Sequence, residues 1–162
     1  MKIYQQILQI QTSGKGLQEI TRKVQQVISE SEITSGLCNI FVRHTSASLV
    51  IQENADPDVI QDLEYFFGKL VPENDLGYTH TTEGPDDMPS HIRSALTKTS
   101  EQIPLAGAKM LFRNLAGDFP LGTPFTRTFQ KCCRPYLRRL ICSFGLRKLS
   151  CCFKVQTFLT EN

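Results

Sequence analysis

Apolar and polar positions alternate regularly over the first 111 residues of the chain and predict a series of strands and helices. Residues 2–11 alternate at a period of two, which predicts a strand. Residues 16–31 and 57–70 repeat their apolar positions at helical spacing and predict two amphipathic helices, the second opening at a proline that follows Asp56. Further strands are predicted over residues 36–45, 48–53, 102–105 and 108–112, and a short helix over residues 88–99.

A long polar loop is predicted between the second and third helices, over residues 71–87. This stretch is rich in Pro, Gly, Asn and Asp, and it contains His80 together with several acidic residues. Loops of such length in compact domains are usually functional or disordered. The loop is therefore the first place to look for a site.

The end of the chain differs from the part before it in pattern and in charge. Residues 119–162 show no sustained period of two or 3.6, and prolines and glycines interrupt their apolar runs. Residues 1–118 hold 10 Lys and Arg against 15 Asp and Glu, a net charge of −5, whereas residues 119–162 hold 8 against 1, a net charge of +7. Five of the six cysteines also lie in this last segment.

The size of the chain, 162 residues with 40% hydrophobic content, favours one domain with a real core. The N-terminus lacks the apolar core of a secretory signal, and no run of about 18 apolar residues occurs. We therefore expect a cytoplasmic protein with no membrane partner. In that compartment the cysteines would be thiols or metal ligands.

Three histidines carry the candidate chemistry. His44, His80 and His91 lie in separate segments, each close to hydroxyl or carboxylate side chains. Imidazoles with carboxylates suit a divalent ion such as zinc, manganese or iron, which can polarise a phosphate or generate hydroxide. The chain has neither HExxH nor CxxC spacing, so the alternative interpretation of three surface or hydrogen-bonded histidines stays open.

Two segments, HTSASLVIQENADPDVIQDL (44–63) and YTHTTEGPDDMPSHIRSAL (78–96), resemble the YjbQ family. The resemblance runs from about residue 3 to about Leu111 and places every histidine on a family position. It implies an α+β fold, a β-sandwich of jelly-roll type with flanking helices, assembled as a homotrimer. It also implies secondary thiamine-phosphate synthase activity, which joins a hydroxymethylpyrimidine diphosphate to a thiazole phosphate.

The resemblance also assigns roles to particular residues. His44 and Thr45 would line the pocket at a strand end, Glu53 and Asp62 would supply carboxylates, and His80, Asp87 and His91 would complete the site. We expect the histidines to bind a divalent metal such as Zn, Mn or Mg, or a phosphate, with Asp87 among the metal ligands. Arg93, two residues after His91, is a candidate to pair with phosphate. The alternatives are structural: Glu53 caps the helix near Pro57, Asp62 lies on a solvated helix face, and Arg93 is a surface cation. For the whole chain the alternatives are a metal-binding module or a metal-dependent hydrolase of a phosphorylated small molecule.

The family pattern stops after the stretch LAGAKML (105–111), where it requires a Gly-Thr-Trp-Gln motif, and this chain has no tryptophan. Residues 112–124, FRNLAGDFPLGTP, can be back-translated into a sequence that reads S-G-T-W-Q-G-I-F-L-W-E-H from its second base. We therefore hypothesise that residues 1–111 form the family-like domain and that the basic, cysteine-rich residues 112–162 are an out-of-frame translation. The C-terminal strands would then be missing or disordered, and activity would be impaired.

A rival interpretation takes this tail at face value. Its adjacent cysteine pairs would bind zinc, and its arginines with nearby aromatic residues would bind nucleic acid. Zinc sites favour CxxC spacing over adjacent pairs, and a basic cluster alone is a weak signal, so a nucleic-acid partner is not expected.

Overall fold

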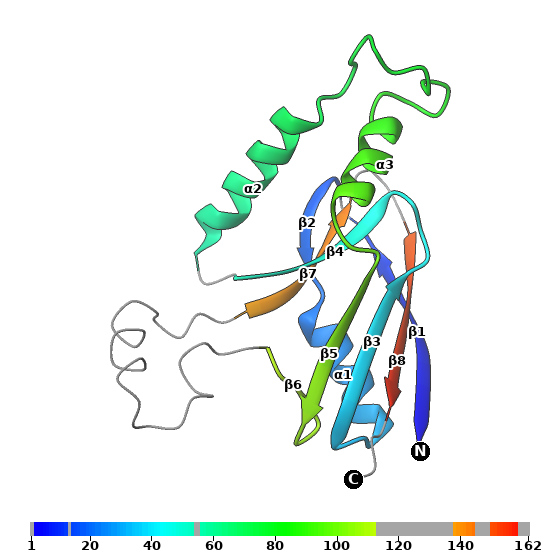
Figure 1. The fold of residues 1–162 in the computed structure, drawn as a ribbon, viewed down its shortest axis with the longest axis vertical. Helices are drawn as coiled ribbons and strands as arrows, with labels where there is room; N and C mark the ends of the chain where they lie inside the picture. Colours follow the sequence, from blue (N-terminus) through cyan, green and yellow to red (C-terminus); the bar gives the residue numbers. More distant parts are fainter. Residues whose placement is uncertain (1, 13, 54–55, 113–137, 145–149, 159–162) are drawn as a thin grey trace.

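The computed structural model describes residues 2–12, 14–53, 56–112, 138–144 and 150–158. They form a mixed α+β fold with antiparallel sheets and three helices (Figure 1). The elements in chain order are β1 (Ile3–Gln11), β2 (Gly16–Glu19), α1 (Thr21–Ser31), β3 (Ser35–Val42), β4 (Ala47–Glu53), α2 (Pro57–Leu70), α3 (Asp87–Leu96), β5 (Ser100–Ala106), β6 (Lys109–Met110), β7 (Arg138–Phe144) and β8 (Ser150–Phe158).

The strands form two sheets, one of five strands in the order β1-β8-β3-β5-β6 and one of three in the order β2-β7-β4. Every named pair is antiparallel. Successive side chains of a strand point to opposite faces, so β3 buries Cys38, Ile40 and Val42 and exposes Leu37 and Phe41 on its other face. The jelly-roll connectivity implied by the resemblance stays a prediction.

Helix α1 packs against the core with Val24, Val27 and Ile28, which are at most 2% exposed. The prediction that this helix begins at residue 16 is wrong, because residues 16–19 form β2 and pair with β7. Gly16 has φ +124°, a value outside the helical region, and the ladder with β7 satisfies the backbone of this short segment.

Helix α2 has the predicted bounds, and its start has the predicted chemistry. The Asp56 side chain accepts a hydrogen bond from the Asp58 backbone nitrogen, and Pro57 occupies the first helical position. None of its residues is buried, and Figure 1 shows the helix projecting beside the sheets. A link to the body of the protein is the Glu64 Oε1 atom, which accepts a hydrogen bond from the Leu17 nitrogen at 3.0 Å.

Helix α3 begins one residue before its predicted start and ends at Leu96, three residues early. Thr97 is extended, with φ −114° and ψ −160°, and leads directly toward β5. Among the described residues, no helix is long and apolar enough to cross a membrane.

The expectation that the C-terminal strands are missing or disordered is wrong for residues 138–144 and 150–158. Strand β8 lies between β1 and β3, and β7 lies between β2 and β4. The ladder bonds come from backbone groups and place few demands on side chains. Two inward apolar residues, Leu140 and Val155, are fully buried and join these strands to the core. Residues 113–137, which include the Cys132–Cys133 pair of the rival zinc interpretation, lie outside the described residues.

Candidate metal centre

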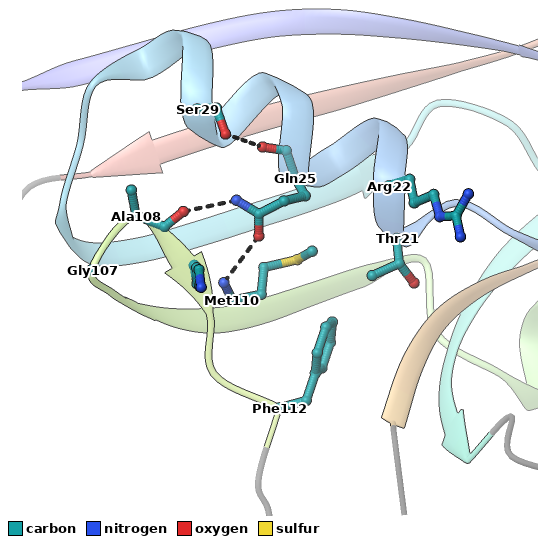
Figure 2. Close-up of a pocket in the computed structure, with 9 residues that line it drawn as sticks. Thr21, Arg22, Gln25, Ser29, Gly107, Ala108, Met110 and Phe112 are labelled. Atoms are coloured by element: carbon teal, nitrogen blue, oxygen red, sulfur yellow. Dashed lines mark hydrogen bonds between the residues drawn. The ribbon is translucent and has the colours of Figure 1, made fainter.

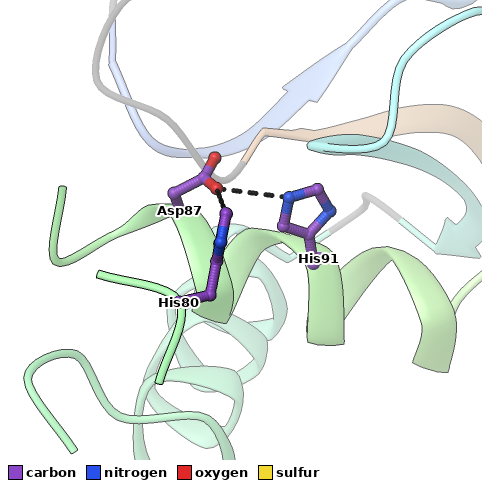
Figure 3. Close-up of side chains that lie close together, drawn as sticks. All are labelled: His80, Asp87 and His91. Atoms are coloured by element: carbon purple, nitrogen blue, oxygen red, sulfur yellow. Dashed lines mark hydrogen bonds and ion pairs between the residues drawn. The ribbon is translucent and has the colours of Figure 1, made fainter. Parts of the chain in front are cut away.

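Three side chains that could hold a metal ion meet at the beginning of α3 (Figure 3). Asp87 and His91 come from the helix, and His80 comes from the preceding loop. The Asp87 Oδ2 atom lies 2.8 Å from His80 Nε2 and 3.2 Å from His91 Nε2. All three ligand atoms lie within 4.8 Å of one another.

The helical pair follows from local geometry. Asp87 and His91 are four residues apart, so their side chains lie on the same face of α3. Asp87 is in the first turn, where the helix dipole stabilises a carboxylate. Pro89 is tolerated there because the first-turn N–H groups have no intrahelical acceptor.

The loop that carries His80 is shaped by a series of turns. The Asp75 side chain accepts from the Gly77 nitrogen at 2.8 Å, and the Gly84 nitrogen donates to the Thr81 carbonyl at 3.4 Å. Gly84 has φ +120°, which only glycine adopts readily. These local bonds bring the loop back to the start of α3, where His80 meets Asp87.

The three side chains of the cluster differ in burial. Asp87 is 4% exposed, whereas the side chains of His80 and His91 are 41% and 35% exposed. A buried carboxylate needs partners, and here both imidazoles direct their Nε2 atoms to the same carboxylate oxygen. A divalent cation among these three atoms would replace the ring protons and use all three groups as ligands.

His44 and Thr45 lie in the turn after β3. The Ser46 nitrogen donates to His44 Nδ1 at 3.0 Å, so the neutral His44 ring carries its proton on Nε2. Thr45 is exposed. Among the described contacts, none joins His44 or Thr45 to the three ligands.

The structure does not bring the two other predicted carboxylates into the cluster: Asp62 has no described contact with it, and the position of the Glu53 side chain is not described. Glu53 is the last residue of β4, where its backbone pairs with Arg138, and its side chain lies outside the described residues. Asp62 is exposed on α2. Their predicted roles as carboxylate donors stay predictions.

Arg93 binds the beginning of the site loop. Its Nη2 atom donates to the Val71 carbonyl at 3.1 Å, and its Nε atom is buried without a hydrogen-bond partner among the described residues. The guanidinium therefore links α3 to the end of α2. Its predicted pairing with phosphate stays a prediction.

Sequence reasoning missed an ion-pair cluster beside the three candidate ligands. Lys15, in the connection between β1 and β2, places Nζ 2.5 Å from Glu73 Oε1 and 3.4 Å from Asp86 Oδ2. Lys15 and Glu73 are 58 positions apart. No periodicity or motif in the sequence links residues at such a separation.

A surface hollow of about 620 Å³ lies between α1 and the turn that joins β5 to β6 (Figure 2). Gln25 crosses it, donating from Nε2 to the Ala108 carbonyl at 2.7 Å and accepting at Oε1 from the Met110 nitrogen at 3.3 Å. Its lining residues include no His, Cys, Asp or Glu, so the hollow lacks metal ligands.

Cys38 cannot serve as a ligand either, although it is a free thiol. It is fully buried, and burial raises the pKa of its thiol to about 12. Metals bind the thiolate, which this environment disfavours.

The fold and the site define an antiparallel α+β protein with a partly exposed His/Asp/His cluster at the start of a helix. The chain belongs to the UPF0047 YjbQ-like family, whose sequence pattern matches residues 6–116. A UPF0047 protein of Synechocystis is 59% identical over 116 residues, which are 72% of this chain and 79% of that protein. The UPF0047 protein YjbQ of Escherichia coli is 40% identical over 103 residues, 63% of this chain and 74% of that protein.

Solved structures share the fold. A conserved hypothetical protein from Thermus thermophilus superposes with a TM-score of 0.72 at 23% identity, covering 94% of this chain and 98% of that one. A YjbQ/UPF0047 protein from Clostridium acetobutylicum gives 0.70 at 24% identity, with the same two coverages. The structural likeness extends beyond residue 116, where the match to the family sequence pattern ends.

Proposed function

We propose that the chain binds a divalent metal ion through His80, Asp87 and His91, and that the bound ion serves a reaction on a phosphorylated small molecule. The observation that carries this proposal is the convergence of three ligand atoms within 4.8 Å on a buried carboxylate. Three protein ligands are the number found in catalytic zinc sites, which keep a position for water or substrate.

The donor set favours some ions over others. Two imidazoles and one carboxylate suit zinc, manganese or iron, whereas magnesium prefers an all-oxygen environment and keeps several of its waters. Among the expected ions, zinc and manganese therefore fit this site better than magnesium.

The charge of the loop also supports a cation. Residues 71–87 contain five acidic side chains and no Lys or Arg, and Lys15 pairs with two of these acids, Glu73 and Asp86. The acidic charge that is left favours a divalent ion over free phosphate. We therefore expect inorganic phosphate to bind at the site only when the metal is present.

For the reaction we propose the secondary thiamine-phosphate synthase activity that the resemblance implies. A bound cation would neutralise charge on a diphosphate leaving group. The His44 ring, with Nδ1 engaged by the Ser46 nitrogen, presents Nε2–H as a donor suited to a phosphate oxygen. Because the family motif after Leu111 is absent from this chain, we expect the activity to be weak.

Calorimetric titration of the purified protein with Zn²⁺, Mn²⁺ and Mg²⁺ tests the metal site. We expect Zn²⁺ and Mn²⁺ to bind more tightly than Mg²⁺, and His80→Ala or Asp87→Asn to weaken binding by at least about tenfold. His44→Ala is the control, since no described contact joins it to the three ligands, and its metal affinity should match the wild type. A wild-type protein that binds none of the three ions, or ligand variants that bind them unchanged, would refute the proposal.

A turnover assay with hydroxymethylpyrimidine diphosphate and thiazole phosphate separates the candidate functions. Formation of thiamine phosphate identifies a synthase, and release of phosphate from either substrate alone identifies a hydrolase. Metal binding without either product identifies a metal-binding module.

We further propose that the chain forms the homotrimer that the resemblance implies, and that the outer face of the five-stranded sheet lies in the interface. On this face Ile3, Ile7 and Phe41 are 50%, 50% and 43% exposed, and the register places Lys154 of β8 between Ile7 and Phe41. Large apolar side chains exposed on a sheet face, here among polar residues, support an association surface. Light scattering should give three times the 18.3 kDa chain mass, and Phe41→Lys should lower it. A monomeric wild type would exclude the trimer.

A further inference from the structure

We propose that Lys15 is a positioning residue that closes the loop 72–86 and thereby brings His80 to Asp87 and His91. The metal-affinity part of the argument rests on the proposed metal site. The loop-closure part stands on the metal-free structure alone.

The argument begins with where the two partners of Lys15 lie. Glu73 stands near the beginning of the loop and Asp86 at its end, and the Lys15 ammonium contacts both carboxylates, at 2.5 and 3.4 Å. One cation thus ties the two ends of the loop to each other and to the connection between β1 and β2. His80 lies in the middle of the segment so closed.

Burial gives this contact more weight than an exposed ion pair. The side chains of Lys15, Glu73 and Asp86 are 22%, 30% and 15% exposed. Exposed ion pairs contribute little, but partly buried charges are less screened by water and salt. A second contact holds the beginning of the loop, because Arg93 Nη2 donates to the Val71 carbonyl at 3.1 Å.

A positioning role of Lys15 and a purely electrostatic role of its charge predict opposite effects of its removal on metal affinity. Replacing Lys15 with methionine removes a positive charge close to the ligands, which by Coulomb attraction alone would tighten cation binding. If Lys15 positions the loop, the same change separates His80 from its partners and weakens binding. Residues that orient metal ligands typically contribute about 10- to 100-fold to affinity.

The experiment compares Lys15→Met with Lys15→Arg and with Lys2→Met, which removes a cation from a separate pair with Glu32. We expect Lys15→Met to weaken Zn²⁺ binding by at least about tenfold, Lys15→Arg to restore most of it, and Lys2→Met to leave it unchanged. Unchanged or tighter binding by Lys15→Met would overturn the proposal.

A second measurement needs no metal and keeps the two proposals separable. Hydrogen exchange of the amides of Gly77, Tyr78 and Gly84 should become about tenfold faster in metal-free Lys15→Met, while the amides of β3 and β5 keep their wild-type protection. Unchanged exchange in the loop would refute the role of Lys15 even in a protein that binds no metal. Absence of metal binding by the wild type would instead refute the proposed function alone.

Discussion

Gly16 offers a quantitative test of how α2 is attached to the sheets. Its backbone has φ +124°, a conformation that L side chains rarely adopt, and a Cβ atom placed there would lie 2.6 Å from Glu64 Oε1. That oxygen accepts the Leu17 backbone hydrogen bond that links α2 to β2. Gly16→Ala therefore introduces backbone strain and displaces this acceptor.

The two costs can be estimated separately. Holding a non-glycine residue in this region costs about 1–3 kcal/mol, and loss of the exposed hydrogen bond adds about 0.5–1 kcal/mol. We expect the free energy of unfolding in urea to fall by about 1.5–4 kcal/mol, the sum of these two terms. Gly14→Ala is the matched control, because its Cβ would meet nothing within 4 Å, and it should change stability by less than about 0.5 kcal/mol.

A double variant separates strain from collision. Glu64→Ala removes the obstructing oxygen, so the cost of Gly16→Ala measured in that background should fall to the backbone strain alone. Equal stability of Gly16→Ala and Gly14→Ala would refute the conformation assigned to Gly16. An unchanged cost of Gly16→Ala in the Glu64→Ala background would show that the carboxylate does not lie where the structure places it.

Three further predictions concern the core and the tail. Leu140→Ala should reduce the free energy of unfolding by about 2–5 kcal/mol because Leu140 is fully buried, whereas Leu76→Ala, at a fully exposed position, should have little effect; equal effects would mean that β7 does not pack as described. Burial raises the pKa of the Cys38 thiol from 9.0 to about 12. As the pH rises, the thiol therefore loses its proton in the unfolded chain before it does so in the folded protein, and the stability present below pH 9 is lost as the pH approaches 12. Between pH 8 and 10 the free energy of unfolding in urea should therefore fall by about 1.4 kcal/mol more in the wild type than in Cys38→Ala. Parallel pH profiles of the two proteins would contradict the raised pKa of Cys38. Sequencing the gene from the codon for Ile103 to the stop codon should show an extra or missing base near the codon for Leu111, and an intact frame would end the frameshift hypothesis.

The elements that sequence predicted well are those whose signals are local. Helix α2 has its predicted bounds because a proline and a capping aspartate define its start. The apolar repeat of α1 is likewise confirmed, but its start is wrong, because the pairing of Gly16–Glu19 with a strand more than a hundred residues away overrides the local pattern. Strands β7 and β8, of seven and nine residues, escaped prediction, and in the structure each is paired on both sides with strands from the first part of the chain.

Part of the candidate site could also be predicted from local signals in the sequence. Asp87 and His91 share a helix face by their spacing, and the structure brings His80 to them from a loop whose composition had marked it as a candidate. The spacing could not identify Lys15, whose partners depend on how the β1–β2 connection meets the loop. Nor could it separate His44 from the three ligands, because only the fold determines which histidines converge.

The division of the chain near residue 111 has different consequences for the ligands and for the sheets. All three proposed ligands, and the cations Lys15 and Arg93, precede that point, so an altered tail leaves the ligand set intact. The strands on either side of Lys15 do depend on the tail, because β1 is paired with β8 and β2 with β7, and both β7 and β8 belong to the tail. A change in the tail would therefore affect the proposed metal centre through these strands. It would loosen the connection that carries Lys15 and, with it, the loop that carries His80. Metal affinity and sheet stability should then decline together in tail variants, whereas substitutions of the ligands should lower metal affinity alone.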